Sequence, residues 1–285
     1  MHKLWESIYS PNYISGYNPF NVKNMNKAIE RLVAAINNRE KILIYGGYDV
    51  DCICGISAFL LVLKYLNADV EYCIADIDDN NNYDLTEKSL KNDIAFLGTK
   101  LLITVGSGLE NEMVETLCEE RGIDLIITEN KKKKSCYKSI YINPSEEKSL
   151  YRYKDISQSG VVFKLMQAIA IYYNMKSINR YLDLILIGGI TKQIGYVGEN
   201  RIILKEGLSY LDRTNNVGLV AIKKFHNIKE LNSENIEKII STLTPRDGAI
   251  SEKDNAKIIV ELLTTGDKDR AEQITKYLHN EKFRL

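Results

Sequence analysis

The sequence lacks the cysteine and histidine patterns of a zinc site or a disulfide framework. Its five cysteines are scattered and form no Cys-x-x-Cys pair, and its three histidines lie far from the polar motifs described below. Such cysteines are typical of reduced thiols in the cytoplasm. The chain also lacks an apolar signal-peptide stretch at its start, and no apolar run approaches the ~20 residues needed to span a bilayer. We therefore expect a cytoplasmic protein without membrane contact.

An excess of charge of one sign is also missing. Lysine plus arginine and aspartate plus glutamate are equal, at 38 each. A balanced chain has no overall field that would draw it onto DNA or an anionic membrane, so any contact with nucleic acid must be local. With 285 residues, of which 45% are hydrophobic, the chain is long enough to bury a substantial core.

Short apolar runs alternate with amphipathic segments in the first half of the sequence. They predict buried parallel strands at residues 42–45, 70–75, 101–105, 124–128 and 140–142, joined by right-handed crossovers with helices on both faces of the sheet. Asn24 is expected to cap the first helix, and residues 86–97 are expected to form one helix. From residue 157 the pattern becomes helical, with helices predicted at residues 160–173, 178–190, 202–211, 236–243, 255–263 and 270–278.

Two carboxylates follow the first predicted strand. Gly46 and Gly47 let the backbone turn at the carboxyl end of residues 42–45, where ligands of open α/β sheets bind. Asp49 and Asp51 come next. On an extended turn both could face one hard cation or one polar cleft, whereas a helix-cap role is the alternative for an aspartate here.

Six separated segments carry a resemblance to a known family. They are KILIYGGYDVDC (41–52), LLITVGSGL (101–109), LIITENK (125–131), INP (142–144), GVVFKL (160–165) and GENRIILKEG (198–207). Together they resemble the DHH phosphoesterases, in particular the RecJ-like exonucleases specific for single-stranded DNA. The resemblance implies a doubly wound α/β fold with a parallel five-stranded sheet in the order 2-1-3-4-5 and a helical C-terminal extension. It also implies a DHH-like domain with helical cover (23–265) and a truncated connecting helix (266–285). Residues 1–22 are aromatic and polar, with Pro11 and Pro19, and are expected to form a lead-in segment.

The residues that carry metal chemistry in that family are mostly replaced. Asp49 and Asp51 match metal ligands of a D-Y-D-x-D-G motif, but Gly47 and Cys52 stand at its first and last positions. Gly106 replaces the ligand aspartate of D-C-G. Glu129, Asn130 and Lys131 stand in place of D-H-H, and Lys192 replaces the aspartate of the fourth motif, G-T-I-A-D.

The loss of these ligands bears directly on function. Hydrolysis by two divalent ions needs a ligand set that holds both ions about 3.5 to 4 Å apart, and only Asp49 and Asp51 remain of it. We therefore expect no metal cofactor and predict a non-catalytic, nucleic-acid-associated binding or scaffold module. A residual Mn²⁺- or Mg²⁺-dependent phosphoesterase, acting as a 5′–3′ exonuclease on single-stranded DNA or short oligonucleotides, is one alternative. A purely structural remnant is another. The expected partners are single-stranded nucleic acid and a DNA repair or replication protein.

Four further residues are candidates for binding phosphate or nucleic acid. Ser107 and Gly108 could cradle a phosphate with backbone N–H groups, or could form only a tight turn. Arg201 and Arg246 could face the cleft, or could lock loops by ion pairing. Lys131 and Lys192 have a different predicted role: at least one ammonium group should lie within about 4 Å of the Asp49 or Asp51 carboxylate, as a salt bridge.

Overall fold

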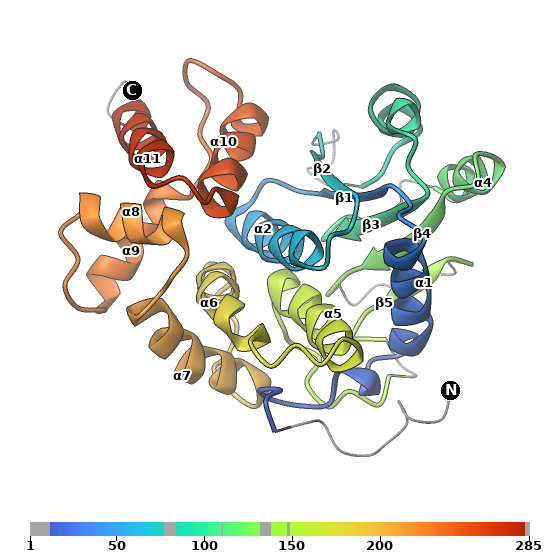
Figure 1. The fold of residues 1–285 in the computed structure, drawn as a ribbon, viewed down its shortest axis with the longest axis horizontal. Coiled ribbons are helices and arrows are strands. Elements are labelled where there is room, and N and C mark those ends of the chain that lie inside the picture. Colours follow the sequence, from blue (N-terminus) through green and yellow to red (C-terminus); the bar gives the residue numbers. More distant parts are fainter. Residues whose placement is uncertain (1–11, 77–83, 110, 132–137, 147–148, 283–285) are drawn as a thin grey trace.

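The centre of the molecule is a parallel sheet. The computed structural model describes residues 12–76, 84–109, 111–131, 138–146 and 149–282. Its five strands are all parallel and lie in the order β2-β1-β3-β4-β5 (Figure 1). They are β1 (Ile42–Gly46), β2 (Val70–Ile74), β3 (Leu101–Val105), β4 (Asp124–Thr128) and β5 (Ile140–Ile142). The predicted fold class and strand order are confirmed.

The central strands β1 and β3 contain almost only apolar residues because both faces of the sheet are covered there. Every residue of β1 and β3 is buried. Ile42 and Ile44 point into one hydrophobic cluster, and Leu43 and Tyr45 point into another on the opposite face. Alternate side chains of a strand point to opposite faces, so both sets must be apolar.

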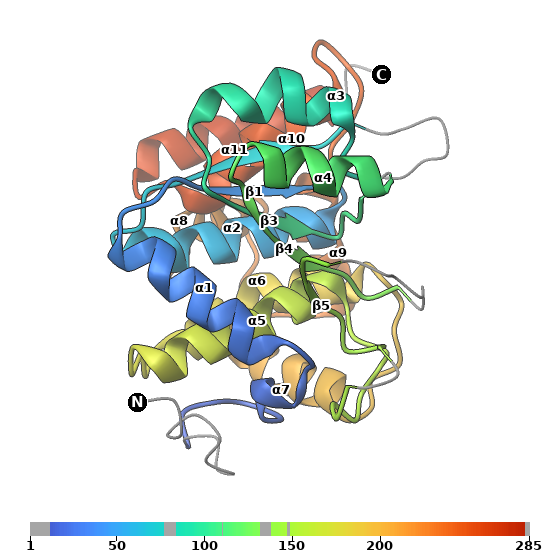
Figure 2. The same ribbon diagram turned by 90° about the vertical axis from the view of Figure 1, so that its right-hand side faces the viewer.

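Helices form a layer on each face of the sheet (Figures 1 and 2). The larger cluster joins one face to α1 (Met25–Asn37), α2 (Val50–Tyr65) and α5 (Gln158–Tyr172). The smaller cluster joins the other face to the π-helical segment η3 (Leu90–Ile94), the 3₁₀ segment η4 (Ala95–Leu97) and α4 (Glu112–Glu120). The short helix α3 (Glu87–Ser89) directly precedes η3. The arrangement is doubly wound.

The remaining helices extend the layer that contains α2 and α5. Two 3₁₀ segments are η2 (Pro19–Asn21) and η5 (Ile178–Tyr181). The α-helices are α6 (Leu182–Ile190), α7 (Glu199–Asp212), α8 (Val217–Phe225), α9 (Ser233–Thr242), α10 (Glu252–Thr264) and α11 (Lys268–Lys282). In Figure 1, α8 to α11 gather at one end of the molecule, next to α2. Within the described residues, no helix combines the length and the apolar character needed to cross a membrane.

Two local predictions need correction, and one helix was not predicted. Residues 86–97 form α3, η3 and η4 instead of one helix, and α8 was not predicted. Asn24 precedes α1 but makes no capping hydrogen bond with its side chain. It has a left-handed backbone (φ 63°), and its side-chain amide donates to the carbonyl oxygen of Tyr141 at 3.0 Å instead.

A buried ion pair holds the N-terminal segment against the helices. Lys164 of α5 and Glu199 of α7 form a 2.7 Å ion pair, with side chains 0% and 1% exposed. Lys164 Nζ also donates to the carbonyl oxygen of Tyr17 at 2.8 Å, and the Tyr17 N–H donates to Glu199 Oε2 at 3.0 Å. The adjacent Gly16 has a φ of +81°, and a Cβ there would lie 2.2 Å from Glu199 Oε1. Glycine is therefore required where this segment crosses the ion pair.

Candidate metal-site remnant

The two retained aspartates lie at the start of α2, directly after the carboxyl end of β1. Asp49 is the N-cap of the helix, and its Oδ1 accepts a hydrogen bond from the Cys52 N–H at 2.9 Å. Asp51 lies in the first turn. The prediction that both stand on an extended turn was wrong, and the helix-cap alternative describes Asp49. The two carboxylates therefore have different surroundings.

Asp51 is fully buried and satisfied by the N-terminus of α5. Its Oδ2 accepts from the Gln158 N–H at 2.8 Å, and its Oδ1 accepts from the Ser159 N–H at 3.0 Å. Gly188 of α6 lies behind it, since a Cβ there would be 2.8 Å from Asp51 Oδ1. Burial raises the pKa of Asp51 above its ordinary value, and the hydrogen bonds from Ser159 and the charge of Lys192 oppose that rise. Both oxygens of this carboxylate already have protein donors.

Asp49 has a lysine as its partner. Lys192, just beyond the end of α6, places Nζ 3.1 Å from Asp49 Oδ2, with side chains 36% and 33% exposed. Partial burial lowers the pKa of Lys192, but the carboxylates of Asp49 and Asp51 outweigh it, so the net pKa is raised. The predicted salt bridge is confirmed for Lys192. Lys131 is exposed and makes no ion pair with any residue that the structure describes.

Gly106 lies against side chains from α2 and α5. It has a φ of +71°, and a Cβ at this position would lie 2.8 Å from Cys52 Sγ and 3.1 Å from Gln158 Cγ. The Gln158 amide donates to the carbonyl oxygen of Thr128 at 3.1 Å and to its hydroxyl at 2.9 Å. Gln158 is thereby fixed across the ends of β3 and β4. Cys52 and Gln158 occupy the space into which a side chain at position 106 would project.

The residues after β4 have structural partners. Glu129 is buried and accepts a hydrogen bond from the Tyr141 hydroxyl at 2.9 Å. Asn130 donates its amide to the carbonyl oxygen of Ile156 at 3.0 Å. These contacts tie the end of β4 to β5 and to the segment before α5.

The four phosphate candidates do not form one site. The Gly108 N–H donates to Asp84 Oδ1 at 3.0 Å, so it is already used. Ser107 is fully buried, and its hydroxyl has no hydrogen-bond partner among the described residues. Arg201 is exposed on α7. Arg246 is half-buried and donates to the Ser241 hydroxyl at 3.3 Å, so it secures the end of α9.

Comparison with known proteins identifies the family. The family described as "DHH family, N-terminal domain" matches residues 41–189, which is more than half of the chain. The chain belongs to the DHH family. It is 32% identical over 260 residues to the single-stranded-DNA-specific exonuclease RecJ of Bacillus subtilis, and the match covers 90% of this chain and 32% of that protein. The DHH protein described here is therefore RecJ-like.

Solved structures agree on the fold of this DHH protein. RecJ from Thermus thermophilus in complex with Mn²⁺ matches with a TM-score of 0.77 and 23% identity, over 92% of this chain and 38% of that one. An exonuclease RecJ bound to manganese matches with a TM-score of 0.80 and 24% identity, over 92% and 66% of the two chains. Curated relatives are longer: the chain spans about a third of the Bacillus subtilis protein and 51% of RecJ from Haemophilus influenzae.

The residues of this DHH protein do not fit a two-metal centre. Asp51 accepts two backbone hydrogen bonds, Asp49 pairs with an ammonium group, and Gly106 brings no ligand atom. Two divalent ions need several oxygen or nitrogen ligands that are free to coordinate. Across the described ranges, no group of three or more histidine, cysteine, aspartate or glutamate residues is placed to hold a metal ion.

The importance of Gln158 was not apparent from the sequence. It lies in no chemical motif, and it follows Cys52 by more than one hundred positions in the chain. Its position directly after the helix-capping Ser157 indicates only that a helix starts there. Its contacts with Gly106 and Thr128 depend on how α5 packs against the sheet.

Proposed function

We propose that this RecJ-like DHH protein is a non-catalytic binding or scaffold module associated with nucleic acid. The observation that carries the proposal is the packing around Gly106. In the family motif an aspartate stands here, but a Cβ at this position would lie 2.8 Å from Cys52 Sγ, so the side chain would fit only if the cysteine side chain moved. Cys52 itself stands where the family motif has glycine. The two replacements are complementary, since the added sulfur fills space that the missing carboxylate would need.

The charge balance of the remnant supports the same proposal. In a metal centre, divalent cations offset the mutual repulsion of the carboxylates. Here Lys192 offsets Asp49, and the backbone N–H groups of Gln158 and Ser159 stabilise Asp51. Groups of the protein itself therefore stabilise both carboxylates.

The proposed ligand is single-stranded nucleic acid, because the RecJ relatives are named for action on single-stranded DNA. We further propose that the protein works in the cytoplasm alongside a DNA repair or replication protein. Because the chain corresponds to only part of those relatives, their whole activity does not transfer to it.

The test measures binding and hydrolysis on one preparation. A 5′-labelled oligothymidylate should bind with an affinity that falls as salt rises, since contacts to phosphate release counterions. No labelled nucleotide should be released in Mn²⁺ or Mg²⁺. Failure to bind at low salt would favour a purely structural role.

One observation favours a second candidate, a residual Mn²⁺- or Mg²⁺-dependent phosphoesterase acting as a 5′–3′ exonuclease. Asp49 and Asp51 remain at positions that match metal ligands, and Asp49 is partly open to solvent. Hydrolysis that is present in the wild-type protein and abolished by Asp49→Ala would establish this candidate and refute the first. Hydrolysis that survives Asp49→Ala would identify a contaminating nuclease.

A further inference from the structure

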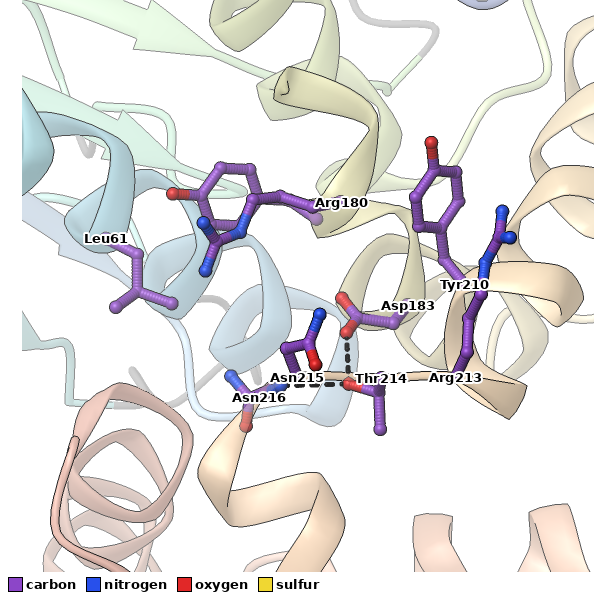
Figure 3. Close-up of a pocket in the computed structure, with 9 residues that line it drawn as sticks. Leu61, Arg180, Asp183, Tyr210, Arg213, Thr214, Asn215 and Asn216 are labelled. Atoms are coloured by element: carbon purple, nitrogen blue, oxygen red, sulfur yellow. Dashed lines mark hydrogen bonds between the residues drawn. The ribbon is translucent and has the colours of Figure 1, made fainter.

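A polar pocket lies between α2, α6 and the segment that joins α7 to α8 (Figure 3). Its cavity volume is about 110 Å³. Its walls include Leu61 of α2, Arg180 and Asp183 near the start of α6, and Arg213 and Asn215 after α7. That volume equals roughly three to four water molecules, which suits one small polar group.

The pocket is separate from the metal-site remnant. Asp51 begins α2, whereas Leu61 lies ten positions later in the same helix, roughly 15 Å along its axis. Likewise, Asp183 lies in the first turn of α6, whereas Lys192 follows the end of this helix. These two residues are therefore more than ~10 Å apart along the helix axis. The two sites therefore lie at opposite ends of the same two helices.

A hydrogen-bonded wall fixes the shape of the pocket. Asp183 is 4% exposed; its Oδ2 accepts from the Thr214 hydroxyl at 2.6 Å, and its Oδ1 accepts from the Leu184 N–H at 2.7 Å. The Thr214 hydroxyl oxygen in turn accepts from the Asn216 N–H at 3.1 Å. Asn216 caps α8 and donates its amide to the Leu263 carbonyl oxygen at 2.8 Å. The segment that carries Arg213 and Asn215 is thus held in place before any ligand arrives.

Two guanidinium groups line this wall with their hydrogen-bonding capacity unused. Figure 3 shows Arg180 and Arg213 on either side of Asp183 and Thr214. Arg180 lies over the ring of Tyr181 at 5.4 Å, and Arg213 lies over the ring of Tyr210 at 5.3 Å. For neither guanidinium does the described part of the chain provide an ion pair or a side-chain hydrogen bond; each has only its ring contact. Stacking on a ring restricts a guanidinium while leaving its N–H groups available.

We propose that this pocket binds the phosphate group of a nucleotide. Planar guanidinium groups donate paired hydrogen bonds to phosphate oxygens, and the Asn215 amide supplies a further donor. Asp183 is the single acidic residue among the nine that line the cavity, so the two arginines leave a net positive charge. The volume admits one phosphate group and leaves the rest of the nucleotide outside, next to the exposed side chains. The site does not rest on the proposed function and would operate whether or not the remnant binds metal.

Calorimetric titration at low ionic strength tests the site. The probes are inorganic phosphate, dTMP, thymidine without phosphate, and tetrathymidylate with and without a 5′-phosphate. Phosphate and dTMP should bind saturably, and thymidine should not. Preference for the 5′-phosphorylated tetranucleotide would assign the site to a strand end. Equal binding of both tetranucleotides would assign it to the phosphate backbone, and binding of dTMP alone would assign it to free nucleotides.

Substitutions of single side chains test the assignment of residues. Arg180→Gln and Arg213→Gln should each weaken dTMP binding by about tenfold or more, because each removes a charge-assisted hydrogen bond. Asp183→Asn should strengthen binding, since it removes the facing negative charge. Lys205→Gln, an equal loss of charge at an exposed position on α7, should leave the affinity unchanged. The proposal is overturned if no phosphate probe binds at millimolar concentration, or if the Arg180→Gln/Arg213→Gln double variant binds dTMP as the wild type does.

Discussion

Replacing Lys164 by methionine should strongly destabilise the folded protein. Lys164 and Glu199 are both essentially without solvent contact and 2.7 Å apart. Burial lowers the pKa of Lys164, while Glu199 opposes that shift. Removing the ammonium group would leave a buried carboxylate without its counter-charge, at a cost of about 3 to 5 kcal/mol. The carbonyl oxygen of Tyr17 would lose its hydrogen-bond donor as well. The free energy of unfolding should therefore fall by at least about 3 kcal/mol.

Urea unfolding followed by circular dichroism measures this change, and two variants control it. The double variant Lys164→Met/Glu199→Gln removes both charges and should recover a substantial part of the loss, because no charge is left buried alone. Lys224→Met breaks the surface pair with Glu272, whose side chains are 68% and 36% exposed, and should cost under about 1 kcal/mol. A Lys164→Met variant that unfolds within about 1 kcal/mol of the wild type would refute the reasoning, since a stranded buried charge costs more than that.

Three other substitutions probe the remnant and the pocket. Gly106→Asp should lower the free energy of unfolding by at least about 2 kcal/mol through backbone strain and contact with Cys52. In a Cys52→Ala background the same substitution should lower the urea midpoint by less. An equal fall in both backgrounds would show that contact with Cys52 is not the cause. Burial raises the pKa of Asp183 to about 6 from 3.8, so its ionisation weakens the fold as pH rises through that range. Asp183→Asn should then add up to about 3 kcal/mol at neutral pH and flatten the stability profile between about pH 4 and pH 6, whereas an unchanged profile would exclude Asp183 as the titrating group. Lys192→Met should change the free energy of unfolding by under about 1 kcal/mol, because its ion pair with Asp49 is partly exposed and screened. The same urea assay measures this change. A much larger fall in the free energy of unfolding would contradict the prediction.

The fold was predictable because its signals are local. Strands of a parallel sheet are mostly apolar because helices cover both faces, so the five strands were predicted within one residue of their observed ends. The division of residues 86–97 into three segments has no such signal. Helix α8 was missed although Asn216, directly before it, is a residue type that is typical of a helix start.

The remnant site was only partly predictable. Opposite charges at ligand positions were enough to predict the contact between Lys192 and Asp49. The contacts of Cys52 and Gln158 with Gly106 depend on the packing of α2 and α5 against the ends of two strands. Sequence spacing carries no information on such contacts, and the same holds for the pocket between Arg180 and Arg213, whose walls come from distant segments.

The strand order has a consequence for the protein as it emerges from the ribosome. Strand β1 is central: residue 42 pairs with residue 70 on one side and with residue 101 on the other. Until residues 101–105 have left the exit tunnel, one side of β1 therefore keeps its N–H and C=O groups unpaired. An exposed apolar strand edge favours association between nascent chains. We expect chains arrested before residue 101 to depend on a chaperone for solubility and chains arrested well beyond β3 to depend on it less, because β3 is the strand that pairs with the open side of β1.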